Sequence, residues 1–388
     1  MAGESFTPLE MLEQLVRFDT TSRNSNLALI DFVVDYLAGH GVAAEIYRDP
    51  AQPKANLFAT IGPADRGGVI LSGHTDVVPV DGQDWSRDPF VLTKDSGRFY
   101  GRGTADMKGF LATALALTPE FKSAPLRRPI HLALSYDEEL GCSGVHSLIA
   151  ALSNRAPRPE ICIVGEPTEM KIVTGHKGIR TYETEITGRE AHSSAPDMGA
   201  SAISAAAELI GFLGRLATEF DRKREAHSRF ALPYSTINVG VIEGGNAINI
   251  IAGHCRFSWE CRPLPGWDED EVIRRFEAFA QDELLPRLRA TAPDARIEIR
   301  ETARVPVYRG QRDSGAETLM RALTGRNRTD VVAFGTEAGL FEGIGIPTVV
   351  CGPGSIGQAH KPDEFIEQEQ IETCLDFLRR LKHRLCQD

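Results

Sequence analysis

The sequence predicts an α/β fold in which a mostly parallel sheet is flanked by helices and carries an inserted ferredoxin-like domain. Continuous apolar runs, such as residues 69–73, are typical of parallel strands that helices cover on both faces. From residue 180 to residue 187 apolar and polar residues alternate, as in antiparallel strands with one solvated face. The continuous pattern returns after Arg304. We therefore expect a discontinuous main domain, residues 1–177 and 303–388, and an inserted domain, residues 178–302.

Four of the expected strands of the main domain end in polar residues. The strands and the residues after them are 69–73 with His74 to Asp76, 130–136 with Asp137 to Glu139, 160–165 with Glu166 to Thr168, and 347–351, which leads through a glycine loop to His360. A glycine-rich turn, residues 100–109, opens an apolar helix near residues 110–117 and adds Asp106. Ligands of open α/β sheets bind outside the carboxyl ends of the strands, so we expect these polar side chains to lie together.

The first of these endings has the residue types of half a metal site. Residues i and i+2 of an extended segment share a face, so Asp76 can hydrogen-bond the outer ring nitrogen of His74 and fix its tautomer. Such a pair alone is more often an ordinary polar loop. Glu138 and Glu139 are neighbours that point to opposite sides, so one can bind metal while the other faces a water molecule.

The insert has the element order β-α-β-β-α-β. We expect strands near 180–187, 236–242, 254–262 and 295–301, an alanine-rich helix near 200–217, and a second helix near 268–287. The alanine-rich helix and the solvated sheet face allow close packing against a second copy. We therefore expect that the insert can pair with a second copy in a homodimer.

Composition limits the class of protein. A chain of 388 residues exceeds the size at which one core keeps growing, so two domains are expected. The net charge of −11 disfavours nucleic acid or an anionic membrane as partner. We find no signal peptide and no run of membrane-spanning length, and therefore expect a cytoplasmic protein. Seven cysteines without a Cys-x-x-Cys pair indicate reduced thiols; Cys142 either lies near the site or is a small packed side chain.

Five short motifs, in order along nearly the whole chain, resemble the di-zinc aminoacylase, carboxypeptidase and succinyl-diaminopimelate desuccinylase family. They are Ser72 to Asp76, Gly101 to Gly109, Asp137 to Glu139, Gly165 to Thr168, and Ala359 with His360. Within this family, residues 85–90, 104–110 and 352–364 are most similar to the acetylornithine deacetylase branch. The resemblance implies a zinc-peptidase-like main domain and an insert that serves as lid and dimerisation domain.

The resemblance also implies a set of metal ligands. Asp106 would bridge two Zn²⁺ ions, His74 and Glu166 would complete one site, and Glu139 and His360 the other. Nitrogen and oxygen ligands suit Zn²⁺, with Co²⁺ or Mn²⁺ as possible substitutes. Two such ions hold a hydroxide and polarise the scissile carbonyl. The clustered carboxylates repel one another without metal, so metal should also stabilise the fold.

Further roles are carried over by resemblance. Glu138 would be the general base, and His192 would stabilise the oxyanion from the neighbouring subunit. By the same resemblance Asn246 and Arg262 would help to bind substrate. Lys177, at the hinge between the domains, could pair with a substrate carboxylate. Alternatives stay open: Glu138 as a solvated strand-end carboxylate, His192 as an exposed turn histidine, and Lys177 as a solvated lysine.

The activity implied is that of a homodimeric zinc amidohydrolase of arginine biosynthesis that converts N2-acetyl-L-ornithine into L-ornithine and acetate. N-succinyl-diaminopimelate, other N-acyl amino acids or dipeptides are alternative substrates. A non-catalytic metal-binding or interaction protein is a third possibility. It is disfavoured because Glu138, which metal binding does not need, is present.

Overall fold

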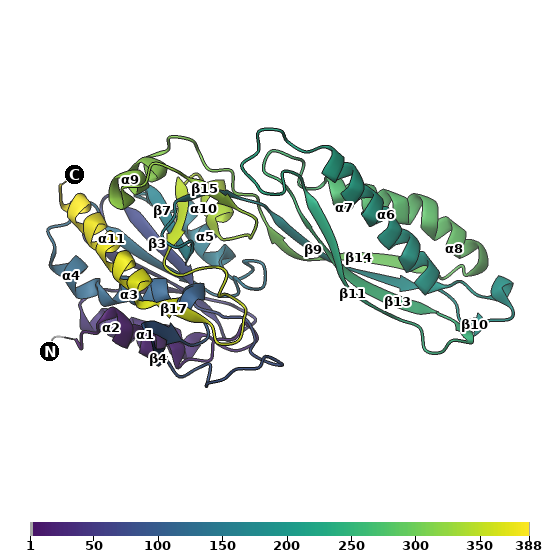
Figure 1. Ribbon diagram of the computed structural model, residues 1–388, viewed down its shortest axis with the longest axis horizontal. Helices are drawn as coiled ribbons and strands as arrows, with labels where there is room; N and C mark the ends of the chain where they lie inside the picture. Colours follow the sequence, from purple (N-terminus) through teal and green to yellow (C-terminus); the bar gives the residue numbers. More distant parts are fainter. Residues whose placement is uncertain (1–2, 388) are drawn as a thin grey trace. The chain divides into compact units, whose positions relative to one another are not determined.

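The computed structural model describes residues 3–387, which fall into two compact units (Figure 1). The first unit comprises the chain up to Gly175, Tyr308–Val331 and the chain from Thr336 onwards. The second comprises His176–Val307 and Val332–Gly335. The expected insert, residues 178–302, lies inside the second unit, and its function as lid and dimerisation domain stays a prediction. Residues 1, 2 and 388 of the expected main domain lie outside the described residues.

The first unit is built on an eight-stranded sheet of order β1-β2-β6-β3-β7-β16-β8-β15. Four adjacent strands are parallel: β6 (Ile130–Ser135), β3 (Val69–His74), β7 (Ile161–Pro167) and β16 (Thr348–Gly352). Every residue of β3, β6 and β16 is buried, which explains their continuous apolar runs. The other strands are β1 (Ala44–Arg48), β2 (Ala55–Ile61), β8 (Val173–His176) and β15 (Asp330–Val332). The predicted fold class is confirmed.

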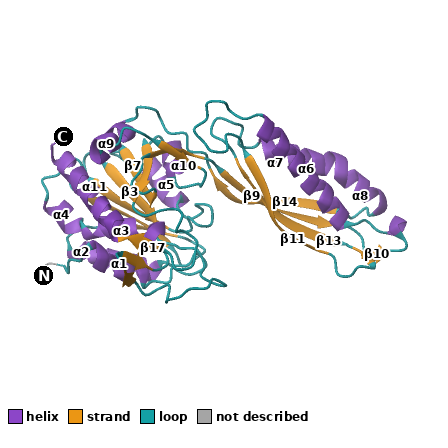
Figure 2. Ribbon diagram, in the orientation of Figure 1, coloured by secondary structure: helices purple, strands orange, loops and turns teal. Residues whose placement is uncertain are grey.

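Helices lie on the faces of this sheet (Figure 2). They are α1 (Pro8–Val16), α2 (Leu27–Gly39), α3 (Gly109–Ala116), α4 (Thr118–Ser123), α5 (His146–Ser153), α9 (Gly315–Thr324), α10 (Ala338–Gly343) and α11 (Gln368–Gln387). Local sequence explains where α1 begins: Thr7 and Glu10 form a reciprocal capping box, and Pro8 occupies the first turn. A small sheet of β4 (Thr93–Asp95), β5 (Arg98–Tyr100) and β17 (Phe365–Glu367) completes the unit.

The second unit has a four-stranded antiparallel sheet of order β11-β13-β9-β14. Its strands are β9 (Ile179–Thr187), β11 (Thr236–Gly244), β13 (His254–Arg262) and β14 (Arg296–Val305), and β9 alternates between buried and partly buried residues along most of its length. With the long helix α6 (Ala202–Arg222) after β9 and the second helix after β13, the order is that of a ferredoxin-like fold. Two short strands, β10 (Ala191–His192) and β12 (Ile250–Ile251), pair beside the sheet, and η2 (Pro196–Met198) follows β10.

The second helix of this unit differs from the expected one. It begins at Glu271 rather than at residue 268, and it consists of α7 (Glu271–Ala278), a wider turn η3 (Phe279–Leu284) and α8 (Leu285–Thr291). Pro286, which cannot donate a backbone hydrogen bond, lies at the start of α8, and this accounts for the break. The described helices of both units include none long and apolar enough to cross a membrane.

Candidate metal centre

The first unit gathers its candidate ligands at the carboxyl ends of the parallel strands. His74 is the last residue of β3, Glu166 lies near the end of β7, Glu139 follows β6, and His360 lies in the loop after β16. Asp106 belongs to the irregular turn η1 (Thr104–Lys108), where it leaves the helical conformation (φ −123°, ψ 88°). Ligands that are up to 286 positions apart in the sequence are thus brought to one edge of the sheet.

The residue that begins the η1 turn must be a glycine. Gly103 has a φ of 81°, in the left-handed region that glycine adopts without strain. A Cβ atom at this position would lie 2.7 Å from Cγ1 of Val77. Gly103 therefore lets the turn pack against the segment that follows β3. His74 is the last residue of β3.

Asp106 lies between the two histidines and offers one oxygen to each. Its Oδ1 is 3.1 Å from Nε2 of His74, and its Oδ2 is 3.4 Å from Nε2 of His360. Glu166 approaches His74, with 3.9 Å between Oε1 and Nε2, while Oε2 of Glu139 lies 3.1 Å from Nε2 of His360. The side chains form two groups that share Asp106.

Burial and neighbouring charges shift the pKa values of the clustered side chains. Burial, followed by the charge of Asp106, raises the pKa of Glu139 to about 7 and raises the pKa of Glu166 well above its ordinary value. Hydrogen bonds to Asp106 and Glu139 raise the pKa of His360 to about 10. Burial lowers the pKa of His74, but hydrogen bonds to Asp106 and Asp76 outweigh it and raise that pKa well above the usual value. Protons on these side chains balance part of the negative charge of the cluster, and a bound cation can take their place.

The donor set fits a divalent cation. Ligand atoms of His74, Asp106 and Glu139 lie within 4.8 Å of one another. Within residues 3–387, the buried Oε1 of Glu166 has no hydrogen-bond partner, although buried carboxylate oxygens are normally satisfied. Imidazole nitrogens and carboxylate oxygens together are a set that Zn²⁺, Co²⁺ and Mn²⁺ accept.

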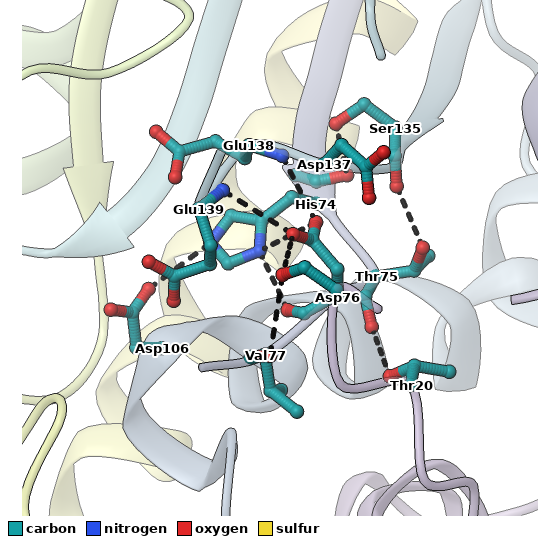
Figure 3. Close-up of polar contacts among 12 residues, drawn as sticks. Thr20, His74, Thr75, Asp76, Val77, Asp106, Ser135, Asp137, Glu138 and Glu139 are labelled. Carbon is teal, nitrogen blue, oxygen red and sulfur yellow. Dashed lines mark hydrogen bonds and ion pairs between the residues drawn. The ribbon is translucent and has the colours of Figure 1, made fainter. Parts of the chain in front are cut away.

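Asp76 faces His74 with two groups, its backbone carbonyl and its carboxylate. Nδ1 of His74 lies 2.9 Å from the backbone carbonyl of Asp76 and 3.5 Å from its carboxylate, so the carbonyl makes the shorter contact. The Asp76 carboxylate also accepts the backbone N–H groups of Glu138 at 3.2 Å and Glu139 at 3.3 Å (Figure 3). The same carboxylate accepts the hydroxyl of Ser22 at 2.8 Å. It fixes the turn that carries both glutamates.

Glu138 and Glu139 leave this turn in different directions, and Glu139 points towards Asp106 (Figure 3). Glu138 is partly buried, and burial raises its pKa well above the ordinary value. Its Oε1 accepts a hydrogen bond from the Cys142 thiol, with 3.5 Å between sulfur and oxygen. Cys142 is therefore both a buried side chain and a neighbour of the site.

Several buried charged residues near the site were missed by the sequence interpretation. Nζ of Lys54 donates to both carboxylate oxygens of Asp137, at 2.6 and 2.7 Å. Glu337, next to helix α10, lies with Oε2 3.5 Å from the Ser72 hydroxyl, and burial raises its pKa to about 7. No local pattern marks Lys54 or Glu337, because each meets its partner across 83 or more positions of sequence.

The other four candidate residues belong to the second unit. His192 is exposed, and its Nδ1 lies 2.8 Å from the hydroxyl oxygen of Ser194. Asn246 is exposed and donates to Glu190, whereas Arg262 binds both carboxylate oxygens of Glu260. The alternative that Lys177 is solvated is wrong: it is 1% exposed, and its ammonium donates to the carbonyl of Tyr234 at 2.7 Å. Burial lowers its pKa to about 8.

Comparison with known proteins agrees with this arrangement. Residues 70–384 match the Peptidase family M20/M25/M40. The chain is 35% identical to the acetylornithine deacetylase of Proteus mirabilis (strain HI4320), over 98% of this chain and 97% of that protein. It is 37% identical to the acetylornithine deacetylase of Yersinia pestis, over 95% and 93%.

Solved structures show the same fold at lower identity. An M20 family metallo-carboxypeptidase from Sulfolobus solfataricus has a TM-score of 0.79 at 18% identity, covering 99% of this chain and 100% of its own. A dinuclear metal binding peptidase of the M20 family from Bacillus subtilis has a TM-score of 0.64 at 16% identity, covering 98% of each chain. The family match and the relatives above 30% identity both extend over most of the chain, so it belongs to the Peptidase family M20/M25/M40 and is a metal-dependent amide hydrolase.

Proposed function

We propose that this hydrolase removes the acetyl group from N2-acetyl-L-ornithine, giving L-ornithine and acetate, and acts in arginine biosynthesis. The observation that carries the proposal is the alignment of this chain with acetylornithine deacetylases over nearly its whole length. Five side chains of metal-ligand type, which lie at one edge of the sheet, support it. We also propose a cytoplasmic location, in keeping with seven free cysteines.

Two Zn²⁺ ions per chain are part of the proposal, with Co²⁺ or Mn²⁺ as substitutes. His74 and Glu166 would hold the first ion, Glu139 and His360 the second, and Asp106 both. The buried, unpartnered oxygen of Glu166 and the position of Asp106 between the histidines support this division. When bound, such ions polarise a substrate carbonyl and lower the pKa of a water molecule.

Glu138 is the general base of the proposed reaction. Its carboxylate takes the proton of the attacking water and passes it to the nitrogen of the leaving amine. A base that must also release its proton needs a pKa near the working pH, and burial raises the pKa of Glu138 in that direction. Asp76, which holds the backbone of this turn, positions both Glu138 and Glu139.

The second unit would supply substrate contacts and the dimer interface. β11 is an edge strand, and exposed apolar residues lie on it and on the segment that follows: Val241, Ile242, Ile248 and Ile250. Edge strands with exposed apolar side chains favour association. We propose that the chain forms a homodimer through this surface. His192 of one subunit would donate to the oxyanion in the other, and Asn246, Arg262 and Lys177 would bind substrate.

A turnover assay with a panel of acylated amino acids tests the substrate. The panel contains N2-acetyl-L-ornithine, N-succinyl-L,L-diaminopimelate, other N-acetyl amino acids and a dipeptide. We expect the highest kcat/KM on N2-acetyl-L-ornithine, because an added succinyl carboxylate without a matching group is rejected strongly. Higher efficiency on the succinylated compound or on a dipeptide would assign the enzyme to that activity instead.

A further inference from the structure

We infer that Glu364, Arg102 and Gln83 form a positioning network that sets the separation of Asp106 and His360, and thereby the affinity for the second metal ion. The inference rests on the two-metal function proposed above. None of the three side chains is among the candidate metal ligands.

One end of the network is the carboxylate of Glu364, which is 1% exposed. Its Oε1 accepts the backbone N–H groups of Ala105 at 2.9 Å and Asp106 at 3.1 Å. Its Oε2 accepts the N–H of Gly103 at 2.9 Å and Nη1 of Arg102 at 2.8 Å. Four donors on one carboxylate hold the η1 turn in place, and Asp106 is part of that turn.

The centre of the network is Arg102, whose side chain is also 1% exposed. Its guanidinium lies over the ring of Trp85, 5.0 Å from the centroid, and donates to the carbonyl of Lys361 at 3.2 Å. It also donates to the side-chain oxygen of Gln83. The amide of Gln83 in turn donates to the carbonyl of His360 at 3.0 Å. A continuous set of hydrogen bonds thus joins the backbone of Asp106 to the backbone of His360.

His360 depends on such support more than His74 does. His74 ends a fully buried strand, and its side chain is 1% exposed. The side chain of His360 is 54% exposed, it lies in a loop, and its φ of 63° is in a region that residues other than glycine seldom adopt. Loosening the network should therefore affect the metal held by Glu139 and His360 more than the metal held by His74 and Glu166.

The inference is tested by titrating the chelator-stripped full chain with Zn²⁺ and measuring the heat of binding by calorimetry. The Gln83→Ala variant removes the link to His360 at a partly exposed position and leaves the Glu364–Arg102 pair intact. We expect Zn²⁺ binding at Glu139 and His360 to weaken about 10- to 100-fold, so that one of the two binding events shifts and the other stays unchanged. Gln368→Ala is the matched control, because Gln368 donates one hydrogen bond to Glu372, outside the network.

Glu364→Gln is a second, stronger variant. An amide offers one acceptor oxygen where the carboxylate offers two, so part of the η1 turn loses its acceptor. We expect the same binding event to weaken at least as much as in Gln83→Ala. If a folded Gln83→Ala protein bound both Zn²⁺ ions with unchanged affinity, or lost affinity equally in both binding events, this inference would be wrong. The proposed function would not be affected by that result. A wild-type protein that binds fewer than two Zn²⁺ would overturn the proposed function and this inference with it.

Discussion

The ammonium of Lys54 lies 2.6 Å and 2.7 Å from the two carboxylate oxygens of Asp137, and both side chains are almost fully buried. Lys54 also donates to the carbonyl of Ser22, the residue whose hydroxyl supports Asp76. Asp137 directly precedes Glu138 and has a φ of 53°. The ion pair and Asp76 therefore hold the glutamate turn from two sides.

Removing one partner of this pair should destabilise the fold. Lys54→Met leaves the Asp137 carboxylate buried without a cation, and we expect a loss of about 3–5 kcal/mol in the free energy of unfolding. The double variant Lys54→Met, Asp137→Asn removes both charges and should regain most of that loss. Urea denaturation measures both. A variant that lacks the exposed Arg17–Glu13 ion pair serves as the control. If Lys54→Met were as stable as this control, Lys54 would not support the turn.

Glu138→Gln should separate catalysis from metal binding. Because Glu138 points away from Asp106, unlike Glu139, we expect normal Zn²⁺ content and a kcat lower by about 10²- to 10⁴-fold. Elemental analysis and turnover on the same sample measure the two quantities. Loss of metal together with a rate restored by added Zn²⁺ would reverse the roles given to the two glutamates.

The stabilisation by Zn²⁺ should grow as pH rises from 6 to 9. In the metal-free fold the pKa of His360 is raised from 6.5 to about 10 and that of Glu139 from 4.5 to about 7. A group whose pKa is higher in the folded than in the unfolded state stabilises the fold at pH values below its unfolded-state pKa. This stabilisation is lost as the pH rises through the folded-state pKa. The metal-free protein therefore loses these contributions across this range, while bound Zn²⁺ competes with fewer protons. Thermal unfolding with and without Zn²⁺ at several pH values measures this stabilisation. A Tm difference between the two samples that decreases as the pH rises would contradict the prediction.

Subunit mixing tests the proposed contribution of His192. His192→Ala alone should lower kcat about 10²- to 10³-fold without changing metal content, because one oxyanion donor is lost. If subunits share sites, random mixing of His192→Ala with Glu138→Gln should restore about a quarter of wild-type activity, since each mixed dimer has one intact site. Mixed dimers that form but stay inactive would place His192 outside the partner's site.

The sequence predicted those parts of the structure that local patterns encode. Continuous apolar runs located β3, β6, β7 and β16, and the polar residues after them are the cluster now seen around Asp106. The closer contact of His74 Nδ1 with the backbone carbonyl of Asp76 was not predicted, because a strand pattern does not say at which residue the strand ends. Lys54 and Glu364 could not be predicted, since their partners lie 83 and up to 262 positions away and ion pairs have no sequence period.

The most direct test of the proposed reaction is a Zn²⁺ titration of the chelator-stripped enzyme with N2-acetyl-L-ornithine turnover as readout. We predict no measurable turnover without metal and a return to full activity as the protein takes up two Zn²⁺ per chain, with bound metal measured in the same samples. Full turnover in the stripped protein, or two bound Zn²⁺ without any release of acetate, would contradict a two-metal acetylornithine deacetylase.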